Sequence, residues 1–576
     1  MSRQYARVII DISHEKVDRP FCYKIPEHLI EVAEVGTCVK VPFGKGNTLR
    51  KGYIIELMDT PDFDPVLIKE IQEAETGVQV EIKLIKLAHW IREEYGSTMI
   101  QALQTVLPVK QKVKQKEKKI LVRKCTSEEA AELAEVCEKK HQPAKAKVLR
   151  ALARDEEIST TLLSQKLHVS SSTILSLKKA GWVEEISELT YRNPLKTRGK
   201  AEKQKKLSYD QQSIVDDIWQ DYNLGIRKTY LIHGITGSGK TECYMELIEK
   251  VVAKGKAVIM LIPEIALTFQ TVMRFQRRFG ERVSILNSTL SAGEKYDQCE
   301  RAKKGKIDIM IGPRSALFAP FENLGLIIID EEHETTYKSE SMPKYHAREV
   351  AEELAKLHNA SVVLGSATPS MESYYKAMSG EYGFFTLKER VTGGNLPKVY
   401  IEDLREELKK GNRSIFSDRL QKLIRDRLAK NEQIMLFLNR RGYSGFISCR
   451  SCGLVIKCPH CDVSLSKHAN GHLVCHYCGY EQSQIKMCPK CGSKYILGFK
   501  AGTEKIEEEF LKVFGPVSIL RMDRDTTKTK ESYEEILSEF MEEKAQVLIG
   551  TQMIVKGHDF PKVRRRKTPR ALPPQV

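Results

Sequence analysis

The feature that most constrains the fold is a glycine-rich loop between a short apolar strand and a helix. Residues 229–241 read TYLIHGITGSGKT, and the segment that follows, ECYMELIEKVVAKG, has helical character. In the pattern G-x-x-x-x-G-K-[ST], glycines let backbone N–H groups surround phosphates, the lysine reaches the β and γ oxygens, and the hydroxyl binds Mg²⁺. The loop therefore predicts an α/β domain that binds ATP through Gly234, Ile235, Thr236, Gly237, Ser238, Gly239, Lys240 and Thr241.

A carboxylate pair that could complete magnesium binding follows a second apolar strand. The segment LGLIIIDEEHE ends this strand in Asp330 and Glu331, about 90 residues after the loop. We expect Asp330 to hold the ion through water and Glu331 to orient or deprotonate the attacking water. Lys240, Asp330 and Glu331 are therefore the predicted catalytic residues.

Charge and length narrow the partner class and the architecture. Lys and Arg number 93 against 76 Asp and Glu, which gives a formal net charge of +17 and favours a polyanion such as nucleic acid as partner. At roughly 150 residues per domain, 576 residues predict several domains. No apolar run of about 18 residues is present and the N-terminus is too charged for a signal peptide, so we expect a cytoplasmic protein without a membrane partner.

The N-terminal part shows three different patterns. Residues 1–105 carry short β-rich runs and then a helical stretch, which predicts a small β-rich, barrel-like module. Residues 110–124 hold eight basic residues, which suits either phosphate contact or a solvated linker. From about 140 to 190 the order of helices predicts a helix-turn-helix with a possible wing, which could contact DNA or protein. The polar stretch RGKAEKQKK then reads as a linker to the ATP-binding domain.

Eight cysteines in four C-x-x-C pairs predict a metal module. Each pair offers two thiolates, so four pairs match two tetrahedral Cys₄ zinc sites, with iron–sulfur ligation as the alternative. Four pairs can combine in three ways, and their spacing does not decide between them. The predicted ligands are Cys449, Cys452, Cys458, Cys461, Cys475, Cys478, Cys488 and Cys491.

Further segments carry a family resemblance. DEEH at 330–333 together with GSATPS at 365–370 resembles motifs II and III of superfamily 2 helicases, which are built from two RecA-like lobes. The chain from residue 1 to about 563 resembles the primosomal protein N-prime family, the PriA-type replication-restart DNA helicases. The segments that carry this resemblance are LIPEIALT, GPRSALFAP, EEHETTYKSE, KYHARE, FLNRRGYS and GTQMIVKGHDFP.

The resemblance implies a division of the chain into functional parts. These are a 3′-DNA-binding β-rich domain (1–105), a basic linker with a winged-helix domain (106–200), helicase lobe 1 (205–395), the start of lobe 2 (396–445), a zinc-binding insert (446–494), the rest of an incomplete lobe 2 (495–563) and a basic tail (564–576). It also implies an ATP-dependent 3′-to-5′ helicase that recognises stalled or forked DNA at replication forks in the nucleoid and helps reload the replicative helicase. The implied partners are forked and single-stranded DNA, single-stranded-DNA-binding protein, and primosome and helicase-loader proteins.

Roles for single residues also follow from the resemblance. Gln211 would read the adenine, and His333 with Gly365, Ser366, Ala367 and Thr368 would couple the nucleotide state to the grip on DNA. Tyr337 and Lys338 lie in a loop that would sense single-stranded DNA, although a single tyrosine is as readily a packing residue. Phe21 matches the aromatic of a pocket for a DNA 3′ end, but Cys22 stands where that pocket has a carboxylate. The resemblance further implies that the outer two and the inner two C-x-x-C pairs combine.

The C-terminal residues depart from the resemblance. After GTQMIVKGHDFPKV the sequence runs RRRKTPRALPPQV, with five basic residues and three prolines, and the QxxGRxGR segment of motif VI is absent. Such a composition disfavours core strands. Because an arginine at the γ-phosphate contributes about 10³ to 10⁵ in turnover to related sites, we expect slow ATP hydrolysis. A scaffold that binds zinc and DNA without motor activity is the alternative function.

Overall fold

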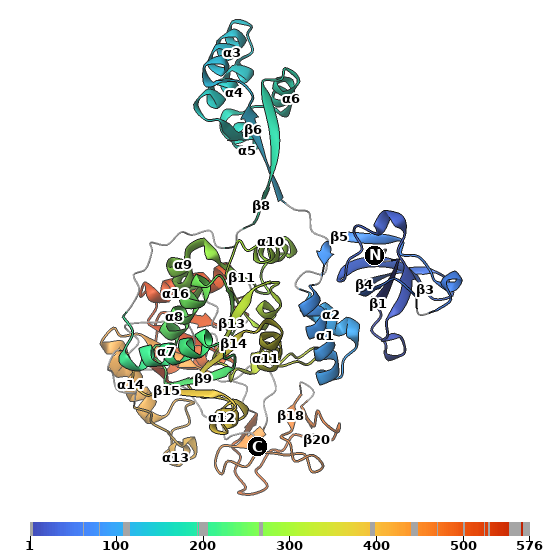
Figure 1. The fold of residues 1–576 in the computed structure, drawn as a ribbon. Helices are drawn as coiled ribbons and strands as arrows, with labels where there is room; N and C mark the ends of the chain where they lie inside the picture. The colour runs from blue at the N-terminus through green and yellow to red at the C-terminus, as the bar shows by residue number, and fades with distance from the viewer. Residues whose placement is uncertain are drawn as a thin grey trace. The chain divides into compact units, whose positions relative to one another are not determined.

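The computed structural model describes residues 4–61, 63–79, 81–107, 116–192, 194, 206–263, 269–391, 398–438, 447–468, 471–498, 502–523, 525–527, 530–551, 554 and 566–567. The chain divides into two compact units, one of residues 1–267 and 272–393, the other of residues 268–271 and 394–576. Figure 1 shows the helices and strands of both units. Among the described residues, no helix is both long enough and apolar enough to cross a membrane.

The N-terminal part of the first unit is an antiparallel sheet followed by two helices. The strands run in the order β2-β1-β4-β3-β5, and Val8, Val39 and Ile54 are fully buried in their core. The β-rich prediction is therefore confirmed. The elements are β1 (Tyr5–Ile10), β2 (Phe21–Lys24), β3 (Thr37–Phe43), β4 (Thr48–Met58), β5 (Glu73–Gln79), α1 (Ile82–Tyr95) and α2 (Met99–Val106).

Helices α1 and α2 bury their apolar faces in the same core as the ATP-binding domain. Leu84, Leu87 and Ile91 recur at helical spacing on one face of α1 and belong to one buried cluster with residues of the later sheet. At the end of α1 the hydroxyl of Tyr95 bonds to the carboxylate of Glu349. The N-terminal sheet is thus joined to the next domain by a continuous apolar layer.

Residues 116–192 form a helical module on a three-stranded sheet of order β7-β6-β8. The predicted helix pair is present, because α5 ends at His168 in the left-handed region (φ 51°) and Ser170 caps α6. Strands β6 and β8 pair along their length (Figure 1). The elements are β6 (Lys116–Arg123), α3 (Ser127–Lys139), α4 (Pro143–Arg154), β7 (Glu157–Ser159), α5 (Thr160–Leu167), α6 (Ser171–Lys179) and β8 (Val183–Thr190).

Strand β6 corrects one interpretation of the basic run at 110–124. Residues 116–123 are not a solvated linker, because they form a paired strand in which Ile120 and Leu121 are buried while Lys119 is exposed. A strand tolerates this charge density because its ladder uses backbone groups and alternate side chains face outward. Residues 108–115, and residues 195–205, which include 198–205 of the predicted RGKAEKQKK linker, lie outside the described residues.

The ATP-binding domain is a parallel sheet of order β11-β12-β10-β13-β14-β9-β15 flanked by helices. The loop strand β9 lies between β14 and β15, and β13 pairs with β14. Parallel strands bring their carboxyl ends to one edge, so the glycine-rich loop, DEEH and GSATPS meet there. The strands are β9 (Thr229–Gly234), β10 (Ala257–Leu261), β11 (Val283–Ile285), β12 (Ile309–Gly312), β13 (Leu324–Asp330), β14 (Ser361–Ser366) and β15 (Gly383–Leu387). The helices are α7 (Tyr209–Asn223), α8 (Lys240–Ala253), α9 (Phe269–Phe279), α10 (Ala292–Lys303), α11 (Ala347–His358) and α12 (Met371–Met378).

The second unit contains a smaller parallel sheet and a cysteine-rich module. The sheet has the order β22-β23-β16-β24, and its core includes Phe416, Leu436 and Phe510. Its elements are α13 (Leu404–Lys409), α14 (Asp418–Ala429), β16 (Ile434–Phe437), α15 (Thr503–Phe514), β22 (Ile519–Met522), α16 (Lys530–Met541), β23 (Val547–Gly550) and β24 (Arg566–Lys567). The cysteine-rich module carries β17 (Ile447–Cys449), β18 (Ser466–Lys467), β19 (His472–Val474), β20 (Glu481–Ser483) and β21 (Ile496–Gly498).

The short strand β24 differs from the expectation for the basic tail. The composition predicts no core strand after Arg564, yet Arg566–Lys567 pairs with β16 in parallel. Two basic residues can extend a sheet edge because the pairing uses their backbone groups. The rest of the tail lies outside the described residues.

Candidate nucleotide and metal sites

The glycine-rich loop has the backbone shape that phosphate binding needs. Gly237 and Gly239 adopt φ of 84° and 82°, in the left-handed region that favours glycine. A Cβ on Gly239 would lie 2.2 Å from the side-chain nitrogen of Gln211, so a larger residue there would be strained in its backbone and would displace that side chain. Gly239 also caps α8 without a side-chain hydrogen bond, and a helix N-terminus of this kind can bind an anion through its backbone N–H groups.

Two polar side chains of the loop fit a bound phosphate. The ammonium of Lys240 is buried and donates to the carbonyl oxygen of Gly234 over 2.7 Å. The hydroxyl of Ser238 is buried and has no hydrogen-bond partner within the described part of the chain. A buried hydroxyl without a partner is unfavourable, and a phosphate oxygen would satisfy it. The residues present therefore fit the polyphosphate of ATP.

Gln211 holds the glycine-rich loop through hydrogen bonds of its side-chain amide. Its side-chain nitrogen donates to the carbonyl of Ser238 over 2.8 Å, and its oxygen accepts from the backbone N–H of Ser208 over 2.9 Å. Both ends of the amide are thus engaged within the protein. The structure shows a role in holding the loop, and adenine reading stays a prediction.

Asp330 and Glu331 lie where β13 ends, beside the loop. Burial, and after it the charge of Glu331, raise the pKa of Asp330 to about 6, while Lys240 opposes the shift. Glu331 adopts φ 50°, a left-handed conformation that is strained for a non-glycine residue and that often marks functional sites. Two adjacent carboxylates in a partly buried position suit a divalent cation, which would favour their charged forms. The chemistry of this donor pair therefore fits Mg²⁺.

The predicted coupling residues connect DEEH to GSATPS. The ring nitrogen Nδ1 of His333 is 2.7 Å from the hydroxyl of Ser366, which also accepts from the backbone N–H of Thr368 over 2.9 Å. The backbone N–H of Glu332 donates to the carbonyl of Gly365 over 3.1 Å. The two motifs are therefore joined directly, as their proposed coupling role requires.

A buried ion pair beneath these motifs was not predicted. The carboxylate of Glu332 is 1% exposed and accepts from the guanidinium of Arg348 over 3.2 Å. It also accepts from the backbone N–H of Ser370 over 2.6 Å and from the hydroxyl of Ser373 over 2.9 Å. The only sequence signal for it was the position of Glu332 within DEEH, because its partners follow no local spacing.

The structure corrects the expectation for Tyr337 as a base-stacking residue. Its side chain is 1% exposed, and its hydroxyl donates to the carbonyl of Asp330 over 2.8 Å. A ring packed on all sides offers no face to a base, so the packing alternative holds. Lys338 is exposed and lies over the ring of Tyr95 at 5.2 Å, which leaves it available to DNA.

Phe21 lies on strand β2 of the N-terminal sheet. Its ring packs edge-on against Phe43 at 5.1 Å, and the guanidinium of Arg19 lies 5.4 Å from its centroid. The side chain is partly buried. Its contact with a DNA 3′ end stays a prediction.

The eight clustered cysteines form two nested sets of four. In each set the four Sγ atoms lie within 4.8 Å of one another. One set contains Cys449, Cys452, Cys488 and Cys491, and the other contains Cys458, Cys461, Cys475 and Cys478. This is the combination that the family resemblance implied.

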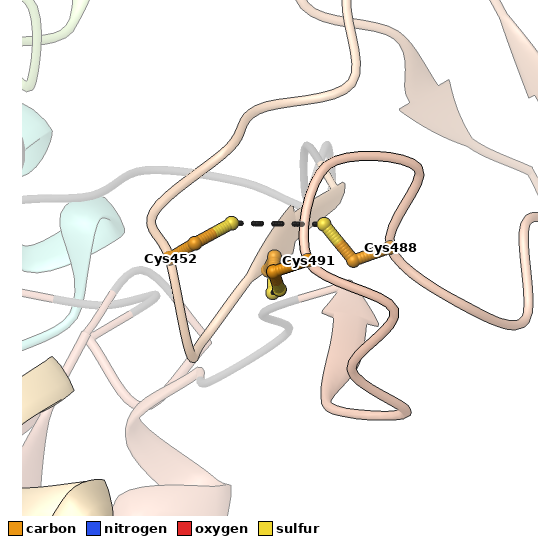
Figure 2. Close-up of side chains that lie close together, drawn as sticks. Cys452, Cys488 and Cys491 are labelled. Carbon is orange, nitrogen blue, oxygen red and sulfur yellow. Dashed lines mark hydrogen bonds between the residues drawn. The ribbon is translucent and has the colours of Figure 1, made fainter.

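The distances between sulfurs fit zinc. The Sγ atoms of Cys452 and Cys488 face each other at 3.6 Å (Figure 2), and those of Cys458 and Cys478 are 3.5 Å apart. Four sulfurs placed tetrahedrally at about 2.3 Å from zinc would be about 3.8 Å apart, whereas a disulfide needs about 2 Å. The two sets are therefore Cys₄ zinc-binding clusters. Zinc bound at a structural site of this kind contributes folding free energy directly.

Three parts of the chain match profiles of known families. Residues 204–371 match the family described as type III restriction enzyme, res subunit. Residues 7–108 match a 3′DNA-binding domain, and residues 458–482 match the PriA DNA helicase Cys-rich region domain.

Curated proteins similar to the chain carry the name replication restart protein PriA. The one from Bacillus subtilis is 40% identical, with 97% of this chain and 77% of that protein covered. The one from Chlamydia pneumoniae is 38% identical, with 97% and 75% covered. Among solved structures, DUF1998 helicase MrfA bound to DNA has a TM-score of 0.38 and 15% identity, over 63% of this chain and 44% of that chain.

Proposed function

We propose that this chain, which belongs to the family of replication restart protein PriA, is an ATP-dependent 3′-to-5′ DNA helicase. In this proposal it recognises stalled or forked DNA and helps reload the replicative helicase. The observation that carries the proposal is the meeting of the glycine-rich loop, DEEH and GSATPS at one edge of a parallel sheet. Such an edge can convert the state of a nucleotide into a movement of the segments that hold DNA.

Each part of the edge has a proposed task in ATP hydrolysis. Bound ATP with Mg²⁺ would supply the phosphoanhydride bond whose cleavage drives movement. Lys240 neutralises charge on the phosphates, and the Thr241 hydroxyl and Asp330 hold the metal. Glu331 orients or deprotonates the attacking water. Gln211 holds the loop and contacts the adenine.

The coupling and DNA contacts are proposed from the joined motifs. His333 and the segment Gly365–Thr368 pass a change at the phosphates to the rest of the lobe through the bond to Ser366. Lys338 and Phe21 contact DNA, the first through its exposed charge and the second in the N-terminal domain. Residues 116–192 act as a winged helix that also contacts DNA.

The proposed partners follow from the family and the charge of the chain. They are forked and single-stranded DNA, single-stranded-DNA-binding protein, and primosome and helicase-loader proteins, met at replication forks in the nucleoid of the cytoplasm. The formal charge of +17 supports the DNA part of this proposal. The two zinc clusters support an ordered module that handles the duplex.

Steady-state ATP hydrolysis by the zinc-loaded chain, with and without forked DNA, tests the proposal. Because motif VI is absent, we expect slow turnover that forked DNA stimulates and that Lys240→Ala abolishes. Lys250→Ala is the matched control, because Lys250 lies on the same helix with its ammonium over Trp219, away from the loop. Unwinding of duplexes with a 3′ tail but not with a 5′ tail would support the polarity.

Two results would contradict the proposal. Turnover that survives Lys240→Ala would mean that the loop does not carry the chemistry. Tight, zinc-dependent binding of forks without any stimulated turnover would favour the scaffold function instead.

A further inference from the structure

Tyr244 is a fully buried tyrosine that touches the catalytic edge and has no assigned role. It lies on α8, one helical turn after Lys240, and its side chain is 0% exposed. Its hydroxyl donates to the carboxylate oxygen Oδ1 of Asp330 over 3.2 Å. A hydroxyl bound to an ionised carboxylate is a charge-assisted bond, which is stronger than a neutral one. The ring thus connects the helix that follows the loop to the DEEH strand.

The same hydroxyl also occupies the space beside Gly365. A Cβ added to Gly365 would lie 1.5 Å from the Tyr244 hydroxyl oxygen and 2.7 Å from the ring carbon that carries it. Gly365 is the direct register partner of Asp330 across β13 and β14. Glycine is therefore required at the start of GSATPS because the tyrosine fills the place of its side chain.

We propose that Tyr244 is a positioning residue that holds the Asp330 carboxylate in its orientation toward a nucleotide-bound divalent cation and ties that orientation to the GSATPS strand. This inference rests on the proposed function. The hydroxyl fixes Asp330, and the ring blocks any approach of Gly365 toward α8. A displacement of GSATPS therefore moves the ring and, through its hydroxyl, the metal-binding carboxylate.

The first test is Tyr244→Phe, which keeps the ring and removes the hydroxyl. The readout is binding of a fluorescent ADP analogue to the full, zinc-loaded chain, titrated with Mg²⁺ and repeated in EDTA. We expect the Mg²⁺ concentration at half-saturation to rise about tenfold, a change of about 1.4 kcal/mol. Affinity in EDTA should stay unchanged, because the loop alone determines it.

Tyr230→Phe is the matched control. Tyr230 is 1% exposed in the same core, and its hydroxyl bonds to the carboxylate of Asp221 over 3.0 Å, outside the predicted catalytic residues. This variant should keep the Mg²⁺ midpoint of the wild type. A merely structural tyrosine at 244 would weaken binding equally with Mg²⁺ and in EDTA, and that result would overturn the inference.

The second test concerns the link to Gly365. Gly365→Ala should abolish Mg²⁺-dependent binding, and adding Tyr244→Phe should restore part of it, because the nearest atom is then the ring carbon at 2.7 Å. Strictly additive losses would overturn the link. If wild-type binding of the analogue does not respond to Mg²⁺, the proposed function and this inference both fail; if it responds and Tyr244→Phe responds identically, only the inference fails.

Discussion

Replacing Asp330 by Asn should stabilise the metal-free protein while removing its response to Mg²⁺. Burial raises the pKa of the Asp330 carboxyl from 3.8 to about 6 in the folded state. Because the folded state then holds the proton more tightly than the unfolded chain, wild-type stability falls as the pH rises from about 4 to about 6 and is level above that range. Asparagine has no proton to lose, so the variant lacks this fall.

The size of the stabilisation in Asp330→Asn follows from the shift in the pKa of Asp330. A difference of about 2 pKa units corresponds to about 3 kcal/mol at 1.36 kcal/mol per unit, which is an upper bound because the carboxylate is only partly buried. In EDTA at pH 8, Asp330→Asn should therefore unfold at a higher urea concentration than wild type, and the two should converge near pH 4. With Mg²⁺ and nucleotide the order should reverse, since only the wild type gains the additional stabilisation that bound Mg²⁺ supplies.

Trp219 is a suitable reporter, because its ring stacks on Tyr222 at 5.2 Å within the ATP-binding domain. Unfolding would be followed by fluorescence in a background with Trp90 and Trp182 changed to Phe, which removes the other two of the 3 tryptophans. Asp221→Asn is the contrasting variant, because its hydrogen bond to Lys228 lowers the pKa of that carboxyl. It should lose stability above pH 4. An Asp330→Asn variant less stable than wild type at pH 8 in EDTA would refute the reasoning.

Three further predictions concern the buried ion pair, the zinc clusters and DNA. Glu332→Ala should cost about 3 to 5 kcal/mol in unfolding free energy, measured by urea titration, because it leaves a buried arginine without its partner. Changing Cys452 and Cys488 together to Ser should lower bound zinc from two ions to one per chain, measured by a colorimetric chelator. Lys338→Ala should weaken single-stranded DNA binding and reduce its salt slope by about one, whereas Tyr337→Phe should cost about 1 kcal/mol of stability without changing that affinity.

Each of these predictions has a control and a contradicting outcome. Glu340→Ala, at an exposed site in the following loop, should leave stability unchanged, and an equal loss there would argue against the ion pair. Cys299→Ser, at a buried thiol outside both clusters, should keep two zinc ions. Retention of two ions by the Cys452 and Cys488 double variant would contradict the nested sets. Loss of DNA affinity in Tyr337→Phe would restore its role as a contact.

The meeting of the glycine-rich loop and DEEH at one sheet edge was largely predictable because the signals of both segments are local. The glycine-rich loop and DEEH each combine a strand with polar residues at fixed spacing, so the sequence pattern alone points to Lys240 and Asp330. Tyr244 could not be found in this way. It looks like any apolar residue of a helix, and its partners Asp330 and Gly365 come from strands about 90 and 120 residues away.

The incorrect expectations have a common physical origin. Composition indicated a linker where β6 forms, because the charge density of the run does not show that Ile120 and Leu121 become buried when β6 pairs with β7 and β8. The family resemblance implied a DNA contact for Tyr337, with packing as the alternative, but loop residues at a sheet edge can turn inward. Burial depends on tertiary neighbours, which a local pattern does not contain.

The apolar layer under α1 and α2 determines which parts of the chain unfold together. Leu87 and Ile91 are 0% exposed in a cluster that also holds Leu317 and Ile327 of the ATP-binding domain. Cutting the chain after residue 107 would expose this face on both fragments. We therefore expect the N-terminal sheet and the ATP-binding domain to unfold as one cooperative unit, so that amide hydrogens of α1 exchange with solvent only in the opening events that also release those of β13.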